Sequence, residues 1–145
     1  MKYNRVRLFG LMSLIAIGAL TLVSENVHAQ SVRFSIKIPF DFYVGNQNMP
    51  AGWYEVRPLA AGSVLQFFER DGKHVSSVMT TGTSVQNNPV KDTVVFNRYG
   101  DQFFLSEVHW RGSLSGRTLT KSSREIEMAR NSILKHVTTT GDEKP

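Results

Sequence analysis

Histidine and carboxylate side chains are the first candidates for chemistry in this chain of 145 residues. Three histidines, His74, His109 and His136, follow the first thirty residues, and none has the short spacing, such as H-x-x-x-H, at which two ligands meet on one metal ion. No cysteine is present to add a thiolate ligand. We therefore predict no metal site and no other cofactor, and we expect His74 to be a cross-strand neighbour of Glu69.

Acidic residues on the expected strands are candidates for the pair of carboxylates that glycoside hydrolysis requires. They are Asp41, Glu55, Glu69 and Glu107. Their spacing singles out no pair. Residues 112–116, Gly-Ser-Leu-Ser-Gly, have leucine where the G-x-S-x-G nucleophile motif needs serine. We predict no catalytic residue, and a small hydrolase using strand carboxylates remains an alternative.

Adjacent aromatic residues are the best indication of a binding site. Residues 53–54, 67–68 and 103–104 are aromatic pairs on expected strands, and neighbours on a strand point to opposite faces. At least one ring of each pair must therefore leave the main core and face a helix, a second sheet or a ligand. We predict ligand contacts at four positions: Trp53, Phe67, Phe103 and Trp110.

Strands are expected wherever apolar and polar residues alternate. Residues 31–38 alternate cleanly, with the apolar side chains on one face. The same parity continues beyond Pro39 to Val44. The pattern therefore allows one long strand with the proline on its solvent face.

A first hairpin is predicted at residues 71–72, Asp-Gly, which favour a two-residue loop. That loop would pair the flanking strands so that Val64 faces Met79 and Phe68 faces Val75.

A second hairpin is predicted around Gly-Asp at residues 100–101, and two registers are open. A three-residue loop places Phe96 opposite Phe104, whereas a two-residue loop places Arg98 opposite Phe103. We favour the three-residue loop, because a slip of one residue moves apolar side chains out of the core.

The C-terminal part is expected to be helical. Ser122 and Glu125 form a capping box, and an apolar stripe from Ile126 to Val137 predicts a helix over residues 122–137 that docks on the sheet. The polar residues 138–145 are expected to be a disordered tail.

The first 29 residues have the three parts of a secretory signal peptide. Basic residues precede an uncharged apolar run over residues 8–23, and Ala29 ends a small-x-small cleavage sequence before Gln30. The run is shorter than the ~20 apolar residues that span a bilayer. We predict cleavage between Ala29 and Gln30, a secreted or periplasmic single β-domain over residues 30–137, and no stable membrane span after cleavage.

The fold class that follows is mainly β. An antiparallel barrel or a two-sheet sandwich of about six to seven strands, with one C-terminal α-helix, fits these elements best. Without cysteine, such an exported domain has neither disulfides nor a lipid anchor and depends on packing.

Charge outside the predicted signal peptide is modest. The whole chain has 17 basic and 12 acidic residues, and residues 1–29 hold 3 and 1 of these, which leaves 14 − 11 = +3. No block of like charge is present. Together with the predicted export, this argues against a nucleic-acid partner.

Four short segments follow one another in a distinctive order. They are residues 38–45 (IPFDFYVG), 50–56 (PAGWYEV), 98–105 (RYGDQFFL) and 121–125 (KSSRE). With its PF-x-F-x-x-G, PAG-x-Y-x-V and RYG-x-x-[FY]-FL motifs, the chain resembles an uncharacterised family of small exported bacterial proteins of the acidobacterial type. The resemblance implies an exported fold of this kind and supplies no catalytic residue, since the motifs consist of turn and core residues.

These observations predict an exported, non-enzymatic β-domain of unknown specific role. It would bind a partner or a small apolar or glycan ligand, or act structurally in the cell envelope. Besides the hydrolase, a second alternative is a peripheral envelope protein held by its basic C-terminal helix. The sequence identifies neither the partner nor the oligomeric state.

Overall fold

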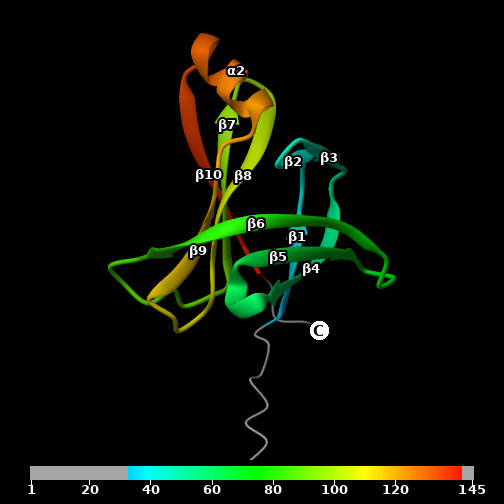
Figure 1. Ribbon diagram of the computed structural model, residues 1–145, viewed down its shortest axis with the longest axis vertical. Coiled ribbons are helices and arrows are strands. Elements are labelled where there is room, and N and C mark those ends of the chain that lie inside the picture. Colours follow the sequence, from blue (N-terminus) through cyan, green and yellow to red (C-terminus); the bar gives the residue numbers. More distant parts are fainter. Residues whose placement is uncertain (1–32, 142–145) are drawn as a thin grey trace, which may run out of the picture. The chain divides into compact units, whose positions relative to one another are not determined.

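Strands dominate the structure, a computed structural model that describes residues 33–141 (Figure 1). They hold 58% of the described residues, which confirms the mainly β class. The predicted signal peptide and its cleavage point between Ala29 and Gln30 lie outside the described residues. In chain order the elements are β1 (Phe34–Ile38), β2 (Phe42–Val44), β3 (Gln47–Met49), β4 (Gly52–Leu59), the 3-10 turn η2 (Ala60–Gly62), β5 (Val64–Glu69), β6 (His74–Ser84), β7 (Thr93–Tyr99), β8 (Gln102–His109), β9 (Ser115–Leu119), α2 (Ser123–Asn131) and β10 (Leu134–Thr140).

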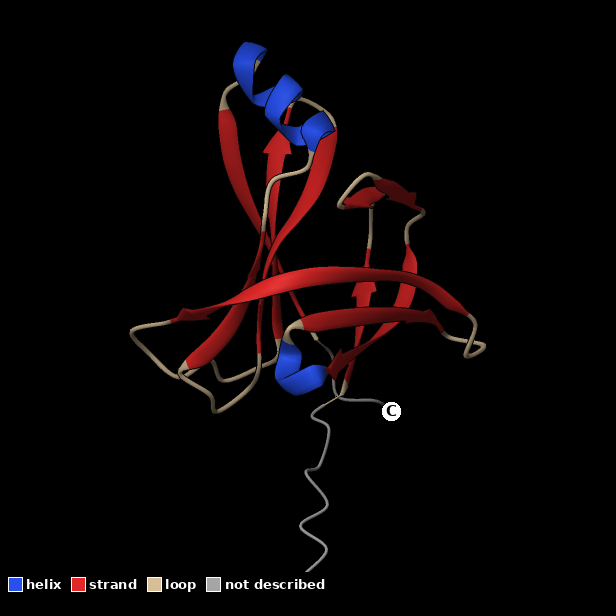
Figure 2. Ribbon diagram, in the orientation of Figure 1, coloured by secondary structure: helices blue, strands red, loops and turns tan. Residues whose placement is uncertain are grey.

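The ten strands form one open, mixed sheet (Figure 2). Its main path is β1-β4-β5-β6-β9-β8, and β8 also pairs with β7, which pairs with β10. The long strand β6 joins two parts, because residues 74–79 pair with β5 and residues 80–84 pair with β9. A single parallel bridge, between Tyr43 and Phe104, attaches the β2–β3 hairpin to β8.

The predicted barrel was wrong, and so was the number of strands. The sheet is not a closed barrel. Closure would need a ladder between β1 and β10, and among the described strands no such ladder is formed. The additional strands are the short β2 and β3 and the C-terminal β10, which was expected to be helix and tail.

Both parts of the sheet cover the same core. The alternation predicted for β1 is confirmed, because Phe34, Ile36 and Ile38 are all buried in this core. The longer strand past Pro39 was wrong: β1 ends at Ile38. Proline has no N–H to donate to a ladder, and Phe40 turns away to pack against the core.

The β5–β6 hairpin has the predicted register only in the half that lies farther from the loop. Val64 lies opposite Met79, as expected. Phe68 lies opposite His74 and not Val75, because a register shift intervenes directly before Phe68. The loop is therefore one residue longer than predicted, and the shift leaves the pairing farther from the loop unchanged.

The β7–β8 hairpin has the two-residue loop, so the favoured three-residue register was wrong. Arg98 lies opposite Phe103, and the loop glycine at position 100 has a φ of +59°. Glycine with positive φ at the first central position is typical of a type II′ turn. In this register Phe96 lies opposite Leu105, and both side chains are buried in the core. A register shift farther from the loop, between residues 95 and 96, then places Val95 opposite Glu107.

The helix starts where the capping box predicted and ends early. The Ser122 hydroxyl accepts the backbone N–H of Glu125 at 3.2 Å. The predicted span 122–137 was wrong, because α2 ends at Asn131 and residues 134–140 form β10, paired with β7 along its whole length. The expected disordered tail was therefore wrong over residues 138–140, and residues 142–145 lie outside the described part. β-Branched residues favour strand here, and β7 offers an edge to pair with.

Candidate binding face and helix attachment

The outward side of β1, β4 and β5 gathers cations and aromatic rings. Alternate residues of these strands face the core, so the residues between them point outward. The register places Lys37 opposite Trp53, and Glu55 opposite Phe68. The cationic face, as we name it, carries four basic residues and one acidic residue, a charge of 4 − 1 = +3. It consists of Arg33, Lys37, Trp53, Glu55, Arg57, Phe68 and Arg70.

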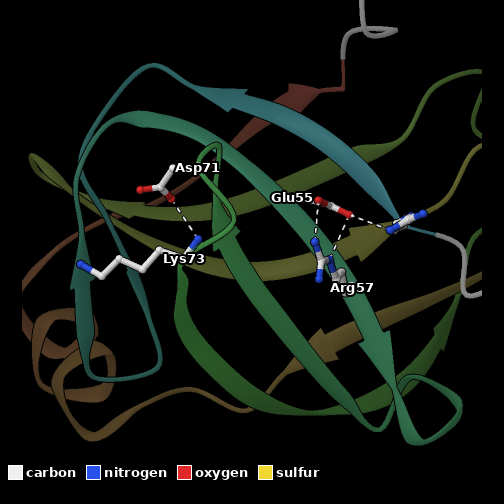
Figure 3. Close-up of polar contacts among 5 residues, drawn as sticks. Glu55, Arg57, Asp71 and Lys73 are labelled. Carbon is white, nitrogen blue, oxygen red and sulfur yellow. Dashed lines mark hydrogen bonds and ion pairs between the residues drawn. The ribbon is translucent and has the colours of Figure 1, made fainter.

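Arg57 is held on this face by contacts with Glu55 and Phe68. Its Nε and Nη2 donate to the two carboxylate oxygens of Glu55 at 3.0 and 2.9 Å (Figure 3). Its guanidinium carbon lies 3.9 Å from the ring centroid of Phe68. The hydrogen bonds to Glu55 raise the pKa of Arg57 above its usual value. Arg33 lies on the other side of Glu55, with its Nη1 3.8 Å from Oε1 of that carboxylate.

Trp53 extends the aromatic surface along β4. The half-buried indole lies two residues before Glu55, which makes it a diagonal neighbour of Phe68, with Cα atoms ~7–8 Å apart. The guanidinium carbon of Arg70 lies 6.0 Å from the Trp53 ring. Two aromatic rings, each with an arginine beside it, therefore lie on the same outward side of the sheet.

The four aromatic residues predicted as ligand contacts do not meet at one site. Trp53 belongs to the cationic face. Phe67 is fully buried and offers no surface to a ligand. Phe103 stacks on Phe40 with centroids 3.9 Å apart, and Trp110 packs edge-on against Phe34 at 6.4 Å.

Sequence reasoning missed the roles of Glu55, Arg57 and Phe68. Glu55 and Arg57 are two residues apart and therefore share one side of a strand, next to Trp53. That spacing was readable in advance. The contact with Phe68 was not, since it depends on how β4 and β5 are paired.

Two of the four candidate carboxylates are engaged by basic partners. Glu55 binds the arginines of the cationic face, and Glu107 lies 2.8 Å from Nε2 of His109 on the same strand. The other nitrogen of this buried ring, Nδ1, has no hydrogen-bond partner and faces Gly116. A general base must reach a substrate proton, and Nδ1 faces a neighbouring strand instead.

The negative charges of Asp41 and Glu69 both contribute to the raised pKa of Tyr54. Burial is the largest cause that raises the pKa of Tyr54 above 10.0, and the two nearby negative charges raise it further. The hydroxyl donates to the carbonyl of Pro50 at 2.6 Å, and Asp41 accepts the N–H of Ala51 at 2.8 Å. Asp41 and Tyr54 therefore fix the turn that leads into β4.

The remaining histidines lie on exposed strand surfaces. His74 was expected beside Glu69; it lies opposite Phe68 instead, 5.2 Å from that ring, and is 2.9 Å from the Ser77 hydroxyl. His136 lies on β10. Within residues 33–141, no three acidic or histidine side chains are placed to hold a metal ion.

The helix is attached to the sheet through polar contacts. Glu125 is 4% exposed, and its Oε1 accepts a hydrogen bond from Asn97 at 2.7 Å and one from the Tyr99 hydroxyl at 3.4 Å. Lys121 donates to the same hydroxyl at 3.2 Å, and this contact raises the pKa of Lys121. The expected docking of an apolar stripe was wrong, because Ile126 is 46% exposed.

No family model, no curated protein and no solved structure matches the chain. The resemblance to small exported bacterial proteins stays a prediction. Over the described part of the chain, the helical segments are too short or too polar to cross a membrane.

Proposed function

We propose that the protein is a non-enzymatic binding domain of the cell envelope, and that its cationic face binds an acidic glycan. One observation carries the proposal: Arg57 is stacked on Phe68 and donates two hydrogen bonds to Glu55, on the same outward side of β4 as Trp53. A guanidinium that is already oriented loses little conformational freedom when it binds a carboxylate or a phosphate.

An acidic sugar chain has both kinds of group that this face can bind. The C–H side of a sugar ring is apolar and packs against a flat aromatic surface such as the indole of Trp53. Its acidic substituents suit Arg33, Arg57 and Arg70, since guanidinium groups bind carboxylates through paired hydrogen bonds. Strands β1, β4 and β5 lie side by side, so the groups are spread over a broad surface that suits an extended polymer.

The predicted export supports a glycan over a nucleic acid, because polysaccharides are the abundant polyanions outside the cytoplasm. The surroundings of the four candidate carboxylates support binding over hydrolysis. Glu55, which lies on the cationic face, accepts hydrogen bonds from Arg57 on both of its carboxylate oxygens and lies 3.8 Å from Arg33, so it is engaged by the arginines and not directed at a glycosidic oxygen.

Calorimetric titration with polygalacturonate, a polymer of an acidic sugar, tests the proposal, with dextran as the neutral control. We expect binding to polygalacturonate only. Trp53→Ala and Arg57→Gln should each weaken it about tenfold or more, in the range of central interface residues. Arg130→Gln removes an exposed arginine on α2 and should leave the affinity unchanged.

Two results would contradict the proposal. One is equal affinity of the Arg57→Gln and Arg130→Gln variants, which would mean that charge alone attracts the polymer. The other is equally tight binding of single-stranded DNA, which would show that the aromatic and cationic groups do not select a sugar chain.

A further inference from the structure

The end of the molecule formed by α2 and the start of β10 has an unusual distribution of side chains. We define this helical tip as residues 121–136. In Figure 1, α2 lies across the ends of β7, β8 and β10, apart from β5 and β6. Seven large apolar side chains among the described residues are exposed, and three of them belong to the tip: Ile126 at 46%, Ile133 at 84% and Leu134 at 39%.

The tip buries charge and exposes aliphatic groups. Glu125 is turned toward Asn97 and Tyr99, whereas its neighbour Ile126 faces solvent. Folding normally buries isoleucine and leaves glutamate in water. The attachment of the helix therefore uses polar contacts and leaves the apolar groups free for an external surface.

The segment that carries the exposed aliphatic groups has a positive net charge. The tip has four basic and two acidic residues, 4 − 2 = +2, and one of the acids is the buried Glu125. Arg130 and Lys135 are both exposed and flank Ile133 in the sequence. Arg124 also lies at the surface, with its guanidinium carbon 4.5 Å from the ring of Tyr43.

We propose that the helical tip binds the surface of a membrane that contains anionic lipid. A few exposed aliphatic side chains on a cationic segment can enter the headgroup region while the cations contact the lipid phosphates. A protein partner fits less well. Stable protein interfaces need about 800 Å² on each side and are enriched in aromatic residues, and none of the three exposed apolar side chains is aromatic.

A labelled cysteine tests this proposal directly, since the chain has no cysteine of its own. The full chain carrying Asn131→Cys is labelled with an environment-sensitive fluorophore and mixed with vesicles that contain phosphatidylglycerol and quencher-bearing lipid. We expect a blue shift and quenching. The matched control is the same label at Asn88→Cys, in an exposed loop, which should show neither. Because both variants share residues 1–32, any binding by that segment affects them equally.

Substitutions then separate the two parts of the interaction. Ile133→Ser should weaken vesicle binding roughly tenfold through lost apolar burial, and Lys135→Glu about fivefold or more through lost attraction to anionic lipid. Val90→Ser is the control, because Val90 is 87% exposed elsewhere. Vesicles of phosphatidylcholine alone should give little signal.

Three results would overturn the proposal. They are an unquenched label at position 131 with anionic vesicles, equal quenching at positions 88 and 131, and a blue shift that depends on protein concentration without vesicles. The last would identify a second copy of the chain as the occupant. None of these outcomes depends on whether the cationic face binds a glycan.

Discussion

Replacing Gly116 with alanine should destabilise the protein through one contact. Gly116 lies on β9 opposite His109 of β8. A Cβ at position 116 would lie 2.8 Å from Cε1 of that ring, closer still to Nδ1, and 3.0 Å from the carbonyl oxygen of Val108. The ring is 5% exposed and held by Glu107. It cannot move aside without breaking that contact.

The size of the effect follows from overpacking. Forcing one methyl group into a packed site destabilises the folded state by about 1–3 kcal/mol. Replacing glycine with alanine also stabilises the protein by about 0.5 kcal/mol, because alanine restricts the conformations of the unfolded chain. The free energy of unfolding should therefore fall by roughly 0.5–2.5 kcal/mol. For a domain slightly over 100 residues this lowers Tm by about 2–15 °C.

Urea denaturation at constant m-value is the measurement, and Gly82→Ala is the matched control. Gly82 lies on β6, the other neighbour of β9, and a Cβ there would meet only one atom, of Arg117, at an ordinary 3.6 Å. That variant should be neutral or slightly more stable. His109→Ala combined with Gly116→Ala should be less destabilised than the sum of the single changes, because removing the ring removes the clash.

The reasoning would be refuted if Gly116→Ala were as stable as Gly82→Ala, or if the His109 and Gly116 changes were additive. Either result would mean that the imidazole does not fill the space above Gly116.

Two further predictions concern buried polar groups. Glu125→Ala leaves the amide of Asn97 without its acceptor and should lower the free energy of unfolding by about 1–3 kcal/mol. Glu125→Gln keeps an acceptor for this amide and should lower the free energy of unfolding less. Equal losses of the two variants in urea denaturation would contradict this prediction. The pKa of Tyr54 is raised in the folded protein, so the unfolded chain loses this phenolic proton at a lower pH. The ionisation of Tyr54 should therefore leave stability unchanged below pH 10.0 and lower the free energy of unfolding as the pH rises above it. Tyr54→Phe should flatten that fall, and an unchanged slope would count against the assigned cause.

Several local features could be predicted because they depend on neighbouring residues. The alternation in β1, the positions of the two hairpins and the Ser122 cap all involve short-range contacts, and the structure contains them, although both hairpin loops differ in length from the prediction. The errors have a different origin. The β7–β8 register depended on which residues of the two strands meet in the core, where Phe96 lies opposite Leu105, and the end of α2 depended on the free edge of β7.

The candidate site was predictable only in part. Trp53 was selected from an aromatic pair, and the same rule selected Phe67, which is fully buried. Alternation shows that the two residues of a pair point to opposite faces, but it does not show which face is covered. That depends on which strands fold over which side of the sheet.

The sequence by itself determined the mainly β class, the alternation along β1 and the start of the helix, since each is encoded by the spacing of nearby residues. Only the tertiary structure decided that the sheet stays open, that Arg57 stacks on Phe68 and that α2 turns Glu125 inward and Ile126 outward. The physical reason is that these features arise between residues far apart in the chain. Asn97 and Tyr99, which lie on β7, provide polar partners for the side of α2 that faces the sheet. No pattern within residues 122–137 shows that these partners are present.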